Sequence, residues 1–152
     1  MSVPVLHESQ AKAVALPGRS LSWLVGKGSG NDQLQAENCS VCTICIPPGE
    51  KARPAHSHPN GEEVVYILSG SGRALVAGEV APVKKGSIVV FPKAAVHMLH
   101  NTGKVEMKAI CFFAPATSLE NYQMFEDVDF PKSAEVNKQS GKVNQQSKGR
   151  TA

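Results

Sequence analysis

The sequence predicts an all-β fold, an antiparallel barrel or sandwich built from short strands. Its 152 residues include 13 glycines and 10 prolines, an abundance that argues against a helical bundle. Turn-forming residues recur about every eight to twelve positions between short apolar runs, a spacing that indicates antiparallel strands. A chain of this length suits one domain and can bury a core without disulfides.

The strands are expected in the following order. Residues 1–37 are expected to form an N-terminal arm with short strands at the apolar runs 14–16 and 21–25, and with a glycine-rich loop at 26–32. A barrel core follows over residues 38–116. Its strands, separated by turn signals, are predicted at 38–46, 62–68, 73–77, 87–91, 96–101 and 106–114. Both faces of strand 62–68 are apolar, so a second layer or the sheet of a dimer partner is expected to cover them.

The C-terminal part is predicted to be an extension over 117–131 and a disordered tail over 132–152. Thr117-Ser-Leu-Glu120 resembles a capping box, and Leu119, Tyr122 and Phe125 follow at three-residue steps. A short helix is therefore expected near 118–125. The tail has no aromatic residue and few apolar ones, which is too little to offset the entropy cost of ordering.

The distribution of charge excludes two classes of partner. The tail holds five of the 16 basic residues and one of the 13 acidic residues, so the rest has 11 against 12. This near-neutral body offers no basic stripe for nucleic acid or for an anionic membrane. No apolar run of about 18 residues and no signal peptide is visible. The chain is therefore expected in the cytoplasm, with its four cysteines reduced.

Two clusters of residues carry the chemistry. His56 and His58 lie two positions apart, which places both rings on one face of a strand, about 6.6 Å apart along the chain. A turn at 59–61 then brings back a carboxylate, from Glu62 or Glu63. In the second cluster His97 shares a strand face with Leu99 and Asn101, while His100 lies on the opposite face.

These clusters resemble the two motifs of the cupin superfamily. Fifteen residues separate the motifs, which suits a small single-domain cupin. The first motif is matched by Gly49, His56, His58, Glu63 and Gly70, and the second by Gly86, Pro92, His97 and Asn101. The chain departs from the pattern in two ways: six rather than five residues precede His56, and Ala94 stands where the motif has glycine. Because alanine is strained at positive φ, the turn at 94 is expected to differ in shape.

The resemblance implies a double-stranded antiparallel β-helix, the jelly-roll barrel of cupins, which encloses one divalent transition metal ion. The ligands it implies are His56, His58, Glu63 and His97, with the six-residue spacer to Gly70 favouring Glu63 over Glu62. Three imidazoles and one carboxylate suit Mn, Fe, Co, Ni, Cu or Zn. In an octahedral shell this set leaves two positions open, which is typical of catalytic rather than structural sites. Similar cupins pair into homodimers, which we expect here too.

Other chemistry-bearing residues are interpreted as packing. Cys39, Cys42 and Cys45 imitate an iron–sulfur spacing, but three-residue steps on a strand place Cys42 opposite the other two. We therefore expect buried thiols, with the face that contains Cys39, Val41, Thr43 and Cys45 as a candidate lining of the barrel.

The favoured hypothesis is a metal-dependent enzyme that acts on a small oxygen-rich metabolite, as a dioxygenase, decarboxylase, lyase or isomerase. The alternatives are a non-catalytic small-molecule-binding or sensor protein, and a structural cupin without metal. No catalytic acid or base is assigned. Tyr66 is expected to face outward, and Arg73 is only a candidate for binding a carboxylate.

Overall fold

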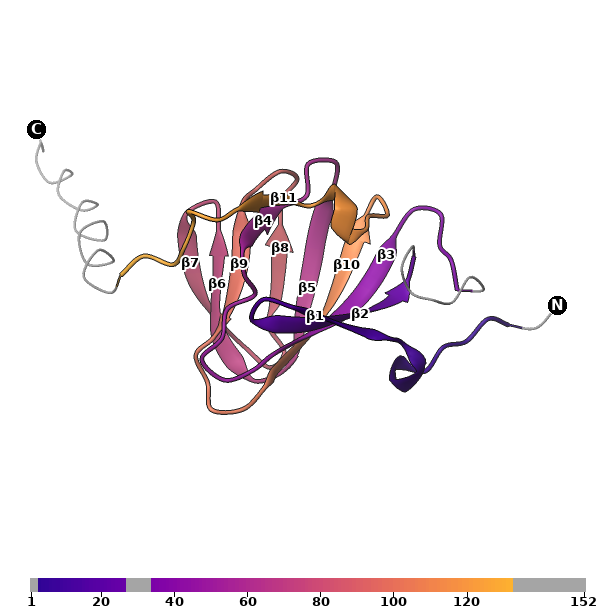
Figure 1. Cartoon of the computed structure of the whole chain (residues 1–152), viewed down its shortest axis with the longest axis horizontal. Helices are drawn as coiled ribbons and strands as arrows, with labels where there is room; N and C mark the ends of the chain where they lie inside the picture. Colours follow the sequence, from indigo (N-terminus) through magenta and orange to yellow (C-terminus); the bar gives the residue numbers. More distant parts are fainter. Residues whose placement is uncertain (1–2, 27–33, 133–152) are drawn as a thin grey trace, which may run out of the picture.

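The computed structural model describes residues 3–26 and 34–132, which fold into two antiparallel sheets (Figure 1). The six-stranded sheet contains, in spatial order, β1 (Ala13–Leu16), β2 (Arg19–Val25), β3 (Ser40–Ile46), β10 (Met107–Ala114), β5 (Glu62–Ser69) and β8 (Ile88–Phe91). The five-stranded sheet contains β11 (Gln123–Phe125), β4 (Ala55–Ser57), β9 (His97–Asn101), β6 (Ser71–Val76) and β7 (Glu79–Lys84). The predicted all-β jelly roll is confirmed.

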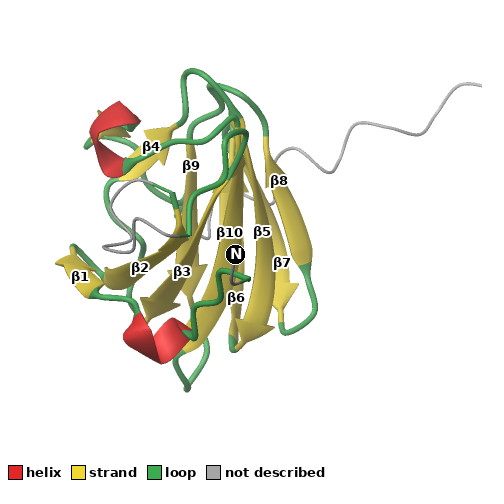
Figure 2. Cartoon of the chain, turned by 90° about the vertical axis from the view of Figure 1, so that its right-hand side faces the viewer, coloured by secondary structure: helices red, strands yellow, loops and turns green. Residues whose placement is uncertain are grey.

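The only helical elements of the described residues are two 3-10 turns, η1 (Glu8–Gln10) and η2 (Leu119–Asn121), drawn in red in Figure 2. Neither turn has the length or the apolar character that crossing a membrane requires. The short helix predicted near 118–125 is wrong, because this range contains only the three-residue turn η2 and the strand β11. Ser118 makes no side-chain capping bond, and the chain after η2 extends into β11, which pairs with β4 instead.

The six predicted core strands are present as β3, β5, β6, β8, β9 and β10. The strand assumed for His56 and His58 is present as β4, which ends at Ser57, whereas β7 and β11 were not predicted. β7 contains Pro82, which argues against a central strand, but β7 lies at the edge of its sheet, where proline is tolerated. The predicted loop beyond Gly26 and the predicted disordered tail beyond Lys132 lie outside the described residues.

The main core lies between the two sheets, and β5 and β10 contribute alternate residues to it. Val65 and Ile67 of β5 are fully buried, whereas Tyr66 between them is exposed on the outer face. β2 pairs along β3 and buries Leu21 and Trp23. This part of residues 1–37 is thus built into the six-stranded sheet.

The turn at Ala94 keeps the shape that the motif glycine would give it, because Ala94 has φ +60°. The expectation of a different turn is wrong. Two backbone hydrogen bonds hold the turn: Ala94 N donates to His58 O at 3.0 Å, and Ala95 N donates to Pro92 O at 3.0 Å. These bonds offset a strain of about 1 kcal/mol and fix the chain between two candidate ligands, His58 and His97.

Candidate metal centre

The structure brings together the four side chains that the sequence singled out. His56 lies in β4, His58 directly after it, Glu63 in β5 and His97 at the start of β9. One nitrogen or oxygen atom from each residue lies within 4.8 Å of the others, and all four residues are at most 7% exposed. His56 and His97 are cross-strand partners in the five-stranded sheet, while Glu63 belongs to the six-stranded sheet.

Backbone carbonyls orient two of the three imidazole rings. His56 Nδ1 lies 3.1 Å from Pro54 O, and His97 Nδ1 lies 2.9 Å from Ala95 O. Because a carbonyl oxygen can only accept, each Nδ1 carries the proton and each Nε2 presents a lone pair. This outer hydrogen bond is typical of histidines that ligate a metal.

Glu63 joins the histidines as a carboxylate. Its Oε2 atom lies 2.8 Å from His58 Nε2 and 3.2 Å from His97 Nε2. Burial alone raises the pKa of Glu63, but the hydrogen bond with His58 Nε2 and the proximity of the His97 ring outweigh burial and hold the pKa well below its usual range. Glu63 is thus ionised at neutral pH.

The donor set fits a transition metal. Burial, followed by the charge of His97, lowers the pKa of His56 to about 3, so this ring is neutral and free to ligate at pH 7. His97 Nε2 is a buried atom with no hydrogen bond of good geometry, which is the state of a ligand atom whose partner is an ion. The adjoining cavity has a volume of about 20 Å³, room for an ion or a single water molecule.

The buried His56 makes the metal-free protein sensitive to acid. In the unfolded chain this imidazole takes up a proton near pH 6.5, whereas in the folded chain it resists protonation down to about pH 3. The free energy of unfolding is therefore expected to fall by a few kcal/mol as the pH drops from 6.5 towards 3. Urea unfolding of metal-free protein at several pH values measures this loss.

The matched variants are His56→Asn, whose amide can still donate to the Pro54 carbonyl, and His7→Asn, which changes an exposed histidine. The first is expected to flatten the pH dependence between 6.5 and 4, and the second to leave it unchanged. Equal slopes in wild type and His56→Asn would contradict the assignment.

Three aromatic rings pack on the candidate ligands. Phe91 stacks on His97, with ring centroids 4.0 Å apart, and Phe113 meets His58 edge-on at 5.0 Å. Tyr122 stacks on His56 at 4.9 Å and meets His58 edge-on at 4.4 Å. These rings shield the site from solvent. Phe113 lies in the core. The role of Tyr122 was not predicted, because this residue was assigned to a helix.

The thiols nearest the site are not the expected ones. Cys42 and Cys111, which are direct partners across β3 and β10, both line the cavity. The inward residues of β3 include Cys42 and Ile44, so the face of Cys39 and Cys45 does not line the barrel, contrary to the sequence reading. Trp23 of β2 lies directly opposite Cys42 and belongs to the same core. Cys42 therefore points inward on β3, and its neighbours along the strand point to the other face.

The remaining candidates lie away from the site. Arg73 is half-buried, with Nη2 lying 3.2 Å from His100 Nδ1 and the guanidinium lying 5.0 Å from the Phe130 ring centroid. Tyr66 faces outward, as predicted. Arg19 lines the cavity beside Glu63 but was missed, because it precedes the barrel strands in sequence.

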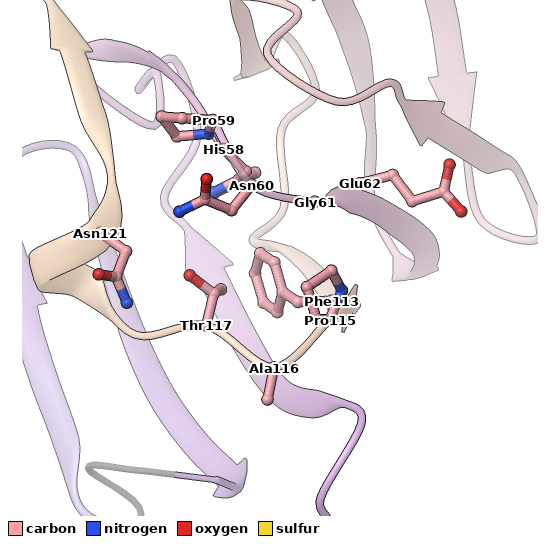
Figure 3. A pocket seen from close by; sticks show the side chains of 10 residues that line it. All are labelled: His58, Pro59, Asn60, Gly61, Glu62, Phe113, Pro115, Ala116, Thr117 and Asn121. Carbon is pink, nitrogen blue, oxygen red and sulfur yellow. The ribbon is translucent and has the colours of Figure 1, made fainter.

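A second pocket, of about 80 Å³, is lined in part by His58 (Figure 3). Its polar lining comes from Asn60, Thr117 and Asn121, while the exposed Glu62 side chain points away from them. His58 Nδ1 is buried and has no hydrogen-bond partner, unlike the corresponding atoms of His56 and His97. His58 is therefore oriented by Glu63 and by the rings of Phe113 and Tyr122, and not by a backbone carbonyl.

Comparison with known proteins agrees with this geometry. A cupin domain family matches residues 42–113. An uncharacterized protein of Methanocaldococcus jannaschii is 33% identical over 87 residues, which cover 57% of this chain and 69% of that protein. A germin-like protein of Arabidopsis thaliana (subfamily 2 member 1) is 37% identical over 79 residues, covering 49% of this chain but only 36% of the germin-like protein. The chain belongs to the cupin superfamily.

Solved structures share the fold at low sequence identity. A variant of a Streptomyces protein with uridine has a TM-score of 0.65 and 15% identity, covering 89% of this chain and 98% of its own. That protein is described elsewhere as a nucleoside dehydratase. A dimethylsulfoniopropionate (DMSP) lyase from Ruegeria pomeroyi has a TM-score of 0.61 and 20% identity, covering 74% of this chain and 59% of its own. Both likenesses establish the fold alone.

Proposed function

We propose that this cupin is a metal-dependent enzyme that acts on a small oxygen-rich metabolite. The observation that carries the proposal is the buried convergence of three imidazoles and one carboxylate within 4.8 Å beside a cavity. A group of four buried polar residues costs stability unless it is satisfied. An ion bound there satisfies the buried lone pairs.

The chain supplies the ligands and their surroundings. His56, His58, Glu63 and His97 would hold the ion, which when bound supplies a Lewis acid that polarises substrate oxygens. The rings of Tyr122, Phe91 and Phe113 exclude water and lower the local dielectric constant around the site. The carbonyls of Pro54 and Ala95 keep two imidazoles in the ligating tautomer.

Enzymatic turnover is favoured over binding alone by the kind of site and by the fold neighbours. In an octahedral shell, a set of three histidines and one glutamate would leave coordination positions open, unlike a closed tetrahedral zinc site. Two proteins of the same fold, the nucleoside dehydratase and the DMSP lyase, carry names of enzymes that act on small organic molecules. Dioxygenase, decarboxylase, lyase and isomerase reactions are all consistent with this site.

The test begins with protein purified without chelators, in which about one transition ion per chain is expected by elemental analysis. The protein is then incubated with a panel of hydroxy acids, keto acids and nucleosides, and products are followed by mass spectrometry together with oxygen uptake. Oxygen consumption would identify a dioxygenase, and turnover without it a lyase, decarboxylase or isomerase. Thermal shifts without any product would instead establish a non-catalytic binder. Absence of metal would refute the proposal.

We further propose that the protein is a homodimer that pairs through the outer face of the six-stranded sheet. An apolar patch covers neighbouring strands β10, β5 and β8, and consists of Tyr66, Leu68, Ile88, Val90 and Phe112, which are 37–67% exposed. Tyr66 lies directly opposite Ile88 on the neighbouring strand. Val64 lies between Phe112 on β10 and Val90 on β8 and pairs with both. Contiguous apolar surface of this kind marks an interface.

Ile88→Asp is therefore expected to give a monomer in light scattering at concentrations where the wild type is a dimer. Val105→Asp is the control, because Val105 is 62% exposed, close to the 67% of Ile88, but lies outside the patch. A monomeric wild type, or an Ile88→Asp variant that stays dimeric, would refute this interface.

We also propose a cytoplasmic location for the protein. All four cysteines, Cys39, Cys42, Cys45 and Cys111, are free thiols, which supports a reducing compartment.

A further inference from the structure

Arg19 is a buried cation in the wall of the candidate metal site. It opens strand β2, whose alternate residues Arg19, Leu21 and Trp23 are all buried on the inner face. Its side chain lines the same cavity as His56, Glu63 and His97, and the residue is only 7% exposed. Burying a guanidinium is costly unless an opposite charge compensates it.

Among residues 3–26 and 34–132, no carboxylate forms an ion pair with Arg19. Its Nη1 donates to the Arg53 carbonyl at 2.7 Å, which satisfies one hydrogen bond but no charge. Glu63, the carboxylate in this cavity, is paired with His58 and His97 instead. Burial lowers the pKa of Arg19, partly offset by Tyr122 and Glu63, as expected for a cation removed from water.

The charge of the complete site is therefore unbalanced. A divalent ion with Glu63 leaves one net positive charge, and Arg19 adds a second. In a cavity walled by aromatic rings, such an excess attracts anions strongly. A neutral donor would serve equally well to hold the Arg53 carbonyl, so the hydrogen bond alone does not explain why this residue is charged.

We propose that Arg19 binds the anionic group of the substrate, and that the substrate is a small carboxylate. This inference rests on the proposed metal-dependent function and adds the substrate class to it. The planar guanidinium can donate two parallel hydrogen bonds to a carboxylate, which fixes the orientation of the substrate beside the ligands. As it stands, the cavity of about 20 Å³ has room for no more than an ion or a water molecule. A carboxylate beside the ion must therefore be small, and the proposal requires the Tyr122 ring, which stacks on His56, to turn aside on binding.

The test compares acetate with acetamide, its uncharged isostere, by calorimetric titration of the full chain in both metal-free and Co²⁺-loaded forms. Wild type is expected to bind acetate at least about tenfold more tightly than acetamide. Arg19→Gln, which keeps an amide donor for the Arg53 carbonyl, is expected to lose this discrimination and to retain one Co²⁺ per chain. Arg53→Gln is the control, because its exposed side chain carries the same charge close by.

The outcomes separate this inference from the proposed function. Normal Co²⁺ uptake with equal binding of acetate and acetamide, or with equal acetate affinity in wild type and Arg19→Gln, overturns the role of Arg19 alone. Failure to take up Co²⁺ overturns the metal site. The role of Arg19 is then tested in the metal-free protein, by comparing the binding of acetate and acetamide in wild type and Arg19→Gln. Arg19→Lys keeps the positive charge but loses the planar pair of donors, so it is expected to retain part of the preference for acetate over acetamide. This variant replaces Arg19→Gln in the test if Arg19→Gln does not fold.

Discussion

Glu63→Gln is expected to bind Co²⁺ or Mn²⁺ at least about 100-fold more weakly than the wild type, since losing an outer-shell partner alone costs about 10–100-fold. The substitution keeps the size of a side chain that is 5% exposed, so the barrel should remain folded. It removes the one negative charge in the site and the Oε2 contacts with His58 and His97. Equilibrium dialysis with elemental analysis measures the affinity.

Glu62→Gln is the matched control for this variant. Glu62 adjoins Glu63 in sequence and was the alternative ligand that the sequence offered. It is exposed, and its carboxylate is directed away from His58 (Figure 3). Its metal affinity is expected to equal that of the wild type. Comparable losses in the two variants would show that general surface charge, and not coordination by Glu63, determines binding.

Asn101→Ala is expected to lower the free energy of unfolding by about 3 kcal/mol or more. Asn101 is fully buried; its Nδ2 donates to Ile46 O and Val105 O, both at 2.8 Å, and its Oδ1 accepts from Gly103 N at 2.9 Å. Alanine removes all three bonds and takes the side-chain donor away from the carbonyls of Ile46 and Val105, while Gly103 N keeps only its bond to Ser71 O, at 3.1 Å. Urea unfolding measures the loss.

Thr102→Ala provides the comparison, because Thr102 is the next residue and is exposed. It is expected to change stability by less than about 0.5 kcal/mol. Metal affinity of Asn101→Ala, measured under conditions where the variant is folded, is expected to stay close to that of the wild type, since Asn101 contacts none of the candidate ligands. A stability change below 1 kcal/mol would contradict the structural role.

The fold and the four candidate ligands could be predicted because the evidence for them is local in sequence. Alternation places His56 and His58 on one face, and fixed spacings to turn glycines identify Glu63. The motif glycine Gly70 illustrates the physical basis: it has φ +82°, and an added Cβ would lie 2.7 Å from Met107 Cα. Such positions restrict residue choice strongly enough to be read directly.

The walls of the site could not be predicted, because tertiary contacts decide them. Tyr122 reaches His56 through the pairing of β11 with β4, two three-residue strands 66 positions apart at Gln123 and Ser57. Arg19 enters the cavity because β2 pairs with β3, a register that the intervening loop does not reveal. At Ala94 a sequence rule failed, because the hydrogen bonds of the turn tolerate positive φ in alanine.

The division of the ligands between the two layers has a mechanical consequence. His56 and His97 come from the five-stranded sheet and Glu63 from the six-stranded sheet, so a shared ion would cross-link the sandwich at its centre. Any ligand that binds only the folded state stabilises it, by about 4 kcal/mol at a thousandfold excess over its dissociation constant. Metal supply would then set how long each chain survives unfolding and proteolysis, independently of any chemistry it performs.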